Sequence, residues 1–426
     1  MLQSVASQME STLNALFAGY EGPAFAIRLW DGWHWSSSVV ERPVCTIVVH
    51  NSRALKTLIA EPNEVALGEA FIHEDLDVEG DLFSVFSIGE HLLDRPRTLR
   101  QKIGEAAVQT LFGLGQRLKH GGRHSMRRDR ASIAYHYDQP CAFYRPWLGR
   151  SLVYSCAYFR SPNDTLDTAQ EQKLELICKK LRLQPLESFL DIGCGWGSLL
   201  LHAATNHQVY AQGVTLSKEQ AAIAQQRIEM AAMERRCTVK IRDYRMLESV
   251  TPSFDKIASV GMFEHVGLEN LRQYFGTVQR LLRPGGAFLN HGIARSALSP
   301  IRKSSFIDRY VFPDGQLVTL TQVIDAAESQ GLEVRDVENL REHYELTLRR
   351  WVEGLRQNSD EILQHVSNVT YRIWLLYMAG SAAAFHRGDI AIYQVLFTRS
   401  SRDRVRRALT REDWYGCASP QLEMQT

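Results

Sequence analysis

A short glycine-rich stretch constrains the fold of this chain more than any other feature. Residues 189–197 read FLDIGCGWG, and a helical pattern begins at Ser198. Glycines accept positive φ and lack Cβ, so the backbone of such a turn can pass close to a ligand at the carboxyl end of a parallel strand. The free N–H groups at the helix start then face that ligand. The stretch predicts a nucleotide-type ligand site, with a plain structural turn as the alternative.

The pattern around this turn predicts a parallel sheet. After Gln170, helical and extended patterns alternate, as crossover connections between parallel strands require. Strands are predicted at 189–192, 208–214, 237–241, 254–260, 287–291, 332–337 and 391–397. Near the amino terminus, a hairpin pattern at 25–35 and a strand at 45–49 instead predict a small α+β unit. We therefore predict an accessory domain over 1–105, a basic linker over 106–130 and a catalytic domain over 131–426.

Charge and cysteine usage exclude several classes of protein. The net charge of the 426 residues is +1, which gives no field for nucleic acid, so no nucleic-acid partner is expected. The seven cysteines form no C-x-x-C pair, so neither a disulfide framework nor a metal site is expected. The amino terminus lacks a signal-peptide pattern and no apolar run is long enough to span a bilayer. These features predict a cytoplasmic protein whose membrane contact is peripheral.

The predicted linker is strongly basic. Only Asp129 opposes its cations, which are Arg117, Lys119, Arg123, Arg127, Arg128 and Arg130. One interpretation is a solvated linker. The other is a patch that meets anionic phospholipid headgroups, where each basic residue contributes about 1 kcal/mol.

The glycine spacing and the next strand distinguish between two kinds of nucleotide-type ligand. Dinucleotide sites favour G-x-G-x-x-G and an acidic residue about 20 residues later, at the ribose. This chain has G-x-G-x-G, and residues 214–220 read VTLSKEQ, without an acidic residue at the strand tip. Further on, Asp243 is placed to accept from an adenine amino group and Tyr244 to stack on the ring. The alternative for Asp243 is an ordinary turn residue.

Five ordered motifs extend over more than half of the chain. They read YSCAYF at 154–159, LDIGCGWG at 190–197, GVTLSKEQ at 213–220, GMFEHVG at 261–267 and HYELTL at 343–348. In these motifs the second domain resembles the cyclopropane fatty acid synthases, which include the mycolic acid cyclopropane synthases. The resemblance implies a Rossmann-like class I methyltransferase fold, S-adenosylmethionine (AdoMet) as methyl donor and the cis double bond of an acyl chain as acceptor. The amino-terminal unit resembles the extra domain of phospholipid-acting members, and a homodimer is also suggested.

The resemblance and the strand-end positions together predict the site residues. The predicted AdoMet contacts are Tyr154, Ser155, Asp191, Gly193, Cys194, Gly195, Gly197, Thr215, Leu216, Ser217, Gln220, Asp243, Tyr244, Arg245 and Val260. The resemblance also implies a bicarbonate ion near the sulfonium, and the residues that match its cradle are Cys156, Glu264, His291, Ile293 and Tyr344. Cys156 and Ile293 would offer backbone groups. Glu264 as a helix N-terminal charge and His291 as a core histidine are the alternatives.

The chemistry of this reaction explains those residue types. Attack of an alkene on a sulfonium methyl leaves a carbocation that water would quench, so the pocket should be apolar and closed. Aromatic faces stabilise such a cation by about 1–2 kcal/mol each. The candidates, for each of which a core position is the favoured alternative, are Tyr137, Tyr158, Phe159, Phe263, Phe306 and Tyr310. Ring closure needs a base, and an anion held by His291 and Tyr344, with Glu264 orienting a donor or accepting the bicarbonate O–H, meets that need.

One position departs from the family pattern. Ser381 stands where family members commonly carry a cysteine, so a covalent thiol mechanism is not expected there. The predicted function is cyclopropane formation on unsaturated phospholipid chains at the inner face of the membrane. The alternatives are a methylene- or methyl-branched product from the same cation, a non-catalytic lipid-binding module and a nicotinamide or flavin dehydrogenase. The glycine spacing and the missing ribose acid count against the dehydrogenase.

Overall fold

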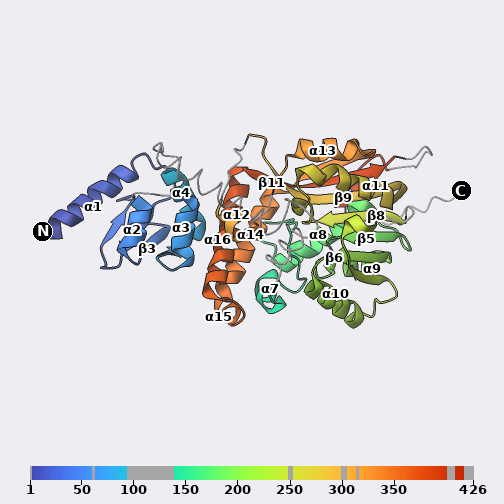
Figure 1. Ribbon diagram of the computed structural model, residues 1–426, viewed down its shortest axis with the longest axis horizontal. Helices are drawn as coiled ribbons and strands as arrows, with labels where there is room; N and C mark the ends of the chain where they lie inside the picture. The colour runs from blue at the N-terminus through green and yellow to red at the C-terminus, as the bar shows by residue number, and fades with distance from the viewer. Residues whose placement is uncertain are drawn as a thin grey trace, which may run out of the picture. The chain divides into compact units, whose positions relative to one another are not determined.

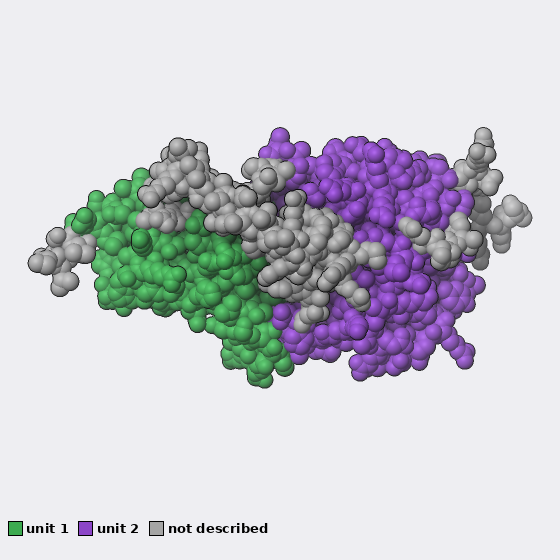
Figure 2. Space-filling model, in the orientation of Figure 1, with its two compact units in different colours: residues 1–123, 300–313, 351–384 green, residues 124–299, 314–350, 385–426 purple. Residues whose placement is uncertain are grey.

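The described residues of the computed structural model are 2–59, 63–93, 139–247, 253–298, 305–312, 316–400 and 408–416. They group into two compact units (Figure 2). Unit 1 comprises 1–123, 300–313 and 351–384, and unit 2 comprises 124–299, 314–350 and 385–426. This division differs from the predicted domains, because two segments from the predicted catalytic domain group with the amino-terminal residues. The predicted basic linker, 106–130, lies outside the described residues.

Unit 2 is built on a seven-stranded sheet in the order β10-β11-β9-β8-β5-β6-β7 (Figure 1). Its strands are β5 (Ser188–Ile192), β6 (Tyr210–Thr215), β7 (Cys237–Ile241), β8 (Phe254–Val260), β9 (Leu282–Arg295), β10 (Leu332–Asn339) and β11 (Ile390–Arg399). Neighbours from β7 to β9 are parallel, whereas β11 runs antiparallel to both β9 and β10. The strand order reverses at β5, and the carboxyl edge beside such a switch point is where open α/β sheets bind ligands. The predicted Rossmann-like methyltransferase fold is confirmed.

Helices cover both faces of this sheet because successive strand residues point to opposite sides. Phe189 packs in a cluster with α8 (Leu166–Leu181) and α9 (Ser198–His207), whereas Leu190 packs in a cluster with α11 (Leu271–Leu281) and α13 (Leu320–Glu328). Figure 1 shows α9 and α10 (Lys218–Met230) on one side of the sheet and α11 and α13 on the other. The remaining helices are α7 (Cys141–Leu148), α17 (Glu412–Tyr415) and the short η2 (Tyr244–Leu247), η3 (Phe263–His265) and η4 (Leu268–Asn270).

Unit 1 has its own sheet and core. The strand order is β2-β1-β3-β4, with β1 (Phe25–Leu29), β2 (His34–Ser36), β3 (Cys45–Val49) and β4 (Leu76–Gly80). Its helices are α1 (Leu2–Leu16), α2 (Ser52–Ile59), α3 (Glu64–Ile72), η1 (Leu82–Ser84), α4 (Val85–Leu93), α12 (Phe306–Tyr310) and α15 (Ser359–Ile362). The division between the units runs within α14 (Arg341–Gln357) and α16 (Asn368–Arg387). The predicted small α+β unit is therefore present, with later segments added to it.

Arg372 of α16 explains how a late segment joins unit 1. Its Nε donates to the Phe71 carbonyl at 2.7 Å and its NH2 nitrogen to the Leu76 carbonyl at 3.0 Å. The guanidinium also lies 4.1 Å from the centroid of the Phe71 ring. Ser381, also on α16, is buried in the same unit. None of the described helices combines the length and the apolar character needed to cross a bilayer.

Candidate functional site

A cavity opens at the carboxyl edge of the unit 2 sheet, at the point where the strand order reverses. Its wall is formed by the ends of β5, β6, β7 and β8, by residues 152–155 and by one face of α8. Each strand contributes the residues at its end because parallel strands all finish at the same edge. The cavity therefore lies where the glycine-rich stretch was predicted to meet a ligand.

The glycine turn forms the floor of this cavity. Gly193 and Gly195 have φ of 83° and 52°, a region that other residues rarely adopt. A Cβ on Gly193 would lie 2.8 Å from the Met262 side chain, so the site leaves no room for one. The amides of Gly193 and Cys194 both donate to the Val214 carbonyl, which ties the turn to β6. The turn is thus held open toward the cavity by backbone contacts.

Most of the predicted AdoMet contacts line the cavity. They are Tyr154, Ser155, Asp191, Gly193, Cys194, Gly195, Thr215, Leu216, Gln220, Asp243, Tyr244, Arg245 and Val260. Two others are placed elsewhere, because they begin helices. Gly197 is the N-cap of α9, and the Ser217 hydroxyl accepts from the Gln220 amide as the N-cap of α10. Their contribution is to position the helices behind the wall.

The polar groups of the wall are already partly paired. The Arg245 guanidinium donates to both carboxylate oxygens of Asp243, at 2.9 and 2.7 Å. The Arg245 amide also donates to Oδ1 at 3.0 Å, so these bonds fix the orientation of the carboxylate and leave Oδ2 with a further lone pair. The Thr215 hydroxyl donates to Gln220 Oε1 at 2.9 Å. The wall therefore presents oriented acceptors and hydroxyls, as the neutral recognition predicted for residues 214–220 requires.

Lys173 is a wall residue that the sequence reasoning missed. It lies on α8, is buried and donates from Nζ to Ser155 Oγ at 2.9 Å. Burial lowers its pKa to about 8, and burial raises the pKa of the nearby Asp191 to about 7 although the Lys173 charge opposes that rise. The signal in the sequence was a lysine on the apolar face of the predicted 169–183 helix. Further wall residues that were not predicted include Met262 and His265.

The five residues of the predicted bicarbonate cradle are joined by one chain of contacts behind this wall. Cys156 Sγ lies 3.9 Å from the Leu340 carbonyl, which also accepts from the Tyr344 amide at 3.0 Å. The Leu340 amide donates to the Ile392 carbonyl, and Ile392 pairs with Ile293 across β11 and β9.

The same chain of contacts continues to the acidic member of the cradle. The Ile293 amide donates to Glu264 Oε1 at 2.8 Å, and His291 lies two residues before Ile293 on β9. These contacts thus link residues from four distant parts of the chain.

Buried polar atoms in this region have no hydrogen-bond partner among the described residues. They include Glu264 Oε2, His291 Nε2 and the Oε1 of Gln394, which lies beside His291. Glu264 as a residue is partly exposed, but its Oε2 is inaccessible, and burial raises the pKa of this carboxyl to about 7. Near neutral pH this carboxyl is therefore present in both its protonated form, which can donate a hydrogen bond, and its ionised form, which can only accept one.

His291 is prepared as a neutral donor. Burial lowers its pKa well below the ordinary value, with the charges of Lys173 and Lys180 adding to the effect. The Gln394 amide nitrogen donates to Nδ1 at 3.0 Å, so the single proton of the neutral imidazole resides on Nε2. Burial also raises the pKa of the Cys156 thiol, which agrees with its predicted role as a backbone contact and not a nucleophile.

The predicted aromatic substrate contacts fall outside the cavity wall. Phe159 and Phe263 are buried in apolar clusters, and Tyr158 stacks on His343 at 4.6 Å between centroids. Phe306 and Tyr310 lie on α12 in unit 1, where Tyr310 donates to Glu69 at 2.7 Å. Tyr137 lies outside the described residues. A role in cation stabilisation stays a prediction for all six.

Comparison with known proteins shows which family and which relatives the chain is similar to. Residues 124–395 match the family described as mycolic acid cyclopropane synthetase, and residues 12–90 match a domain family of unknown function. A probable fatty acid methyltransferase of Pseudomonas putida is 38% identical over 91% of this chain and 95% of its own length. The cyclopropane-fatty-acyl-phospholipid synthase of Escherichia coli is 38% identical over 64% of this chain and 68% of its own. A solved mycolic acid cyclopropane synthase complexed with S-adenosylhomocysteine and CTAB is 32% identical, with a TM-score of 0.60 over 63% of this chain and 98% of its own.

Proposed function

This chain belongs to the mycolic acid cyclopropane synthetase family, and from that premise we propose that it is an AdoMet-dependent cyclopropane-fatty-acyl-phospholipid synthase. The reaction adds a methylene group to the cis double bond of an unsaturated acyl chain in a membrane phospholipid. The observation that carries the proposal is the pair of buried atoms without a partner among the described residues, Glu264 Oε2 and His291 Nε2, of which His291 pairs across β9 and β8 with the wall residue Val260. A fold that only bound lipid would gain nothing from burying them, because unpaired polar atoms cost about 1–3 kcal/mol each.

The cavity fits AdoMet by the chemistry of its wall. The glycine turn brings backbone close to the ligand, Asp243 faces the cavity as an acceptor for the adenine amino group, and Tyr244 offers a ring for stacking. Thr215 and Gln220 supply neutral hydrogen bonds where a dinucleotide enzyme places an acid. When bound, AdoMet supplies a methyl group on a sulfonium. Asp191 and Lys173 are further titratable groups of the wall and would orient the polar end of the ligand.

The region behind the wall fits a small anion that is also a base. When bound, bicarbonate supplies the base that removes one proton from the transferred carbon. His291 Nε2 donates to an anion oxygen, and Glu264, whose pKa is about 7, either donates to the anion or accepts from its O–H. The Ile293 amide holds the Glu264 carboxyl in place through a 2.8 Å hydrogen bond. These residues would keep the base in a buried site, which protects the carbocation from water.

A second candidate function uses the same site. The Pseudomonas putida relative, similar over nearly the whole chain, is described as a probable fatty acid methyltransferase. A methyl- or methylene-branched product requires the same alkene attack and the same cation, with a different fate for the proton. The product is therefore the outcome that the experiment below distinguishes.

We also propose that the enzyme works at an anionic membrane surface on the cytoplasmic side. Support comes from the cations of residues 106–130 and from the phospholipid substrate in the name of the Escherichia coli relative. Each cation near such a surface contributes about 1 kcal/mol. A homodimer is proposed on the family resemblance, and size-exclusion chromatography with light scattering tests it.

The test is lipid mass spectrometry on a bacterial host that lacks its own cyclopropane synthase, with NMR of the modified chains. We expect a gain of one CH₂ on monounsaturated chains together with cyclopropyl proton signals. Vinylidene or branched-methyl signals would favour the second candidate. If the protein bound AdoMet but the lipids gained no CH₂, the proposal that an unsaturated acyl chain is the acceptor would be overturned. If the protein did not bind AdoMet, a lipid-binding module would be favoured. Glu264→Gln serves as the inactive variant and Glu269→Gln, an exposed residue nearby, as its control.

A further inference from the structure

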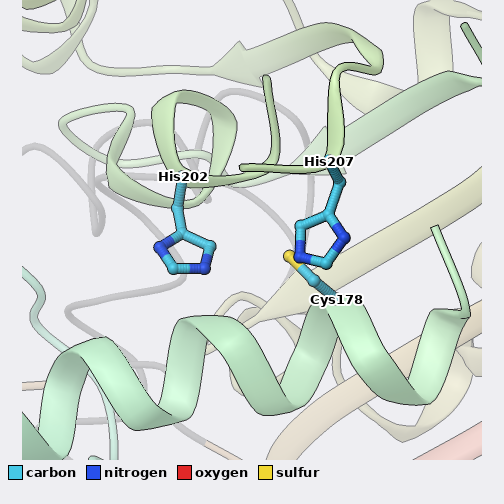
Figure 3. Close-up of side chains that lie close together, drawn as sticks. All are labelled: Cys178, His202 and His207. Carbon is cyan, nitrogen blue, oxygen red and sulfur yellow. The ribbon is translucent and has the colours of Figure 1, made fainter. Parts of the chain in front are cut away.

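Four side chains that commonly ligate metals meet between α8 and α9, in a cluster that the proposed reaction does not use. Glu175 and Cys178 lie one turn apart on α8, whereas His202 lies in the middle of α9 and His207 at its end. Figure 3 shows both imidazoles reaching from α9 toward α8, with the Cys178 thiol close to His207. Ligand atoms of Cys178, His202 and His207 all lie within 4.8 Å of one another. The cluster brings two nitrogens, a sulfur and a carboxylate together.

The carboxylate of Glu175 brings the two imidazoles to one point. Its Oε2 lies 3.0 Å from His202 Nε2 and 3.1 Å from His207 Nε2. In a tetrahedral zinc site with metal–ligand distances of about 2.0–2.2 Å, two ligand atoms lie about 3.4 Å apart. The nitrogen–oxygen distances are already close to that value. The sulfur and the two imidazole nitrogens lie within 4.8 Å of one another, so ion binding requires these three groups to approach further.

Burial makes the cluster more than a surface coincidence. Cys178 is fully buried, and the side chains of His202 and His207 are 15% and 18% exposed.

We propose that Glu175, Cys178, His202 and His207 bind one Zn²⁺ ion that fastens α9 to α8. Two imidazoles, one thiolate and one carboxylate form a tetrahedral donor set for zinc, whereas Mg²⁺ and Ca²⁺ prefer oxygen ligands. On binding, the Cys178 S–H bond breaks, an S–Zn bond forms and the proton leaves to solvent. The imidazole protons that now point at Glu175 move to the other ring nitrogens, so that Nε2 can bind the ion.

The position of this site gives it a structural role next to the cavity. α9 begins directly after the glycine turn, and α8 carries Lys173 in the cavity wall. Fastening the two helices together restrains both sides of the AdoMet cavity without touching its ligand. The spacing E-x-x-C followed by H-x₄-H is visible in the sequence, but only the packing of α8 on α9 shows that the two pairs meet.

The experiment measures zinc by mass spectrometry of the untagged full-length protein, and then the absorption of the metal-free protein during titration with Co²⁺. We expect about one metal per chain, with the thiolate-to-cobalt band and the d–d bands of a tetrahedral ion. Cys178→Ser should lose the thiolate band. His207→Gln, at a partly exposed position, should weaken Co²⁺ binding by about tenfold or more. Cys237→Ser, a buried cysteine on β7, should bind as the wild type does.

Two results would overturn the proposal. One is a wild-type protein that takes up no metal under titration. The other is equal binding by the wild type and His207→Gln, which would place any metal elsewhere. His207→Gln leaves the buried thiol unchanged. It therefore tests whether this cluster binds the metal even if Cys178→Ser does not fold. These measurements need no lipid product, so they stand apart from the test of the methylene transfer.

Discussion

Replacing Glu264 with glutamine should stabilise the fold while it removes the activity. The carboxyl accepts from the Ile293 amide through Oε1, and its Oε2 is buried without a partner among the described residues. Glutamine has the same shape and keeps an oxygen for the Ile293 amide. It carries no charge at any pH, so it removes the cost of burying an ionised carboxylate.

The size of the effect follows from the pKa. Burial raises the pKa of Glu264 from 4.5 to about 7, a difference equivalent to about 3 kcal/mol. The folded chain binds this proton more tightly than the unfolded chain, so the stabilising contribution is fully present below pH 4.5 and is lost as the pH rises to about 7. The glutamine variant does not lose stability in this way, because its side chain does not titrate. At pH 8 the variant avoids the cost of about 3 kcal/mol for the buried carboxylate, but its unpaired amide hydrogens cost about 1–3 kcal/mol. We therefore expect a small net gain in the free energy of unfolding.

Urea unfolding at pH 5, 6, 7 and 8 measures the difference between variant and wild type. We expect the variant to gain about 2–3 kcal/mol relative to the wild type between pH 5 and pH 8, while its lipid-modifying activity falls about 100-fold. The control, Glu269→Gln, should follow the wild-type pH dependence. If the free energies of unfolding of Glu264→Gln and of the wild type changed with pH in the same way, the argument from the buried carboxylate would be refuted. Retained activity would refute the role of Glu264 in the cradle.

Three further outcomes are expected from other parts of the molecule. Gly193→Ala should weaken AdoMet binding, which calorimetry measures, because a residue with φ of 83° would place its Cβ 2.8 Å from the Met262 side chain. We expect the resulting strain to cost about 1–3 kcal/mol, and an unchanged affinity would contradict this. Gln394→Leu removes the donor to His291 Nδ1, so we expect the free energy of unfolding to fall by about 1–3 kcal/mol. We also expect a lower kcat at an unchanged KM for AdoMet, and a change in KM alone would count against this role of Gln394. Arg372→Met should lower the Tm of the protein, since two backbone carbonyls of unit 1 lose a charged donor, and an unchanged Tm would show that these contacts contribute nothing.

The sequence alone predicted the fold class and the edge of the sheet at which the site lies. Strand and helix periodicities and the glycine turn are local signals, and they correctly placed all seven strands of the unit 2 sheet. Most of the predicted AdoMet contacts line the cavity for the same reason, since each strand end carries its own short motif. Gly197 and Ser217 instead begin helices, and Lys173 and Met262 line the cavity without having been predicted.

What only the tertiary structure decided depends on neighbours that are distant along the chain. Burial of Lys173 beside Ser155, and the raised pKa of Glu264, follow from packing that no periodicity records. The aromatic predictions could not separate core from pocket, because a phenylalanine has the same apolar signature in both. The meeting of Glu175 with His202 likewise required α8 and α9 to pack together. Periodicity specifies which face of an element is buried, whereas the identity of the partner, and hence the chemistry, is set by the folded arrangement.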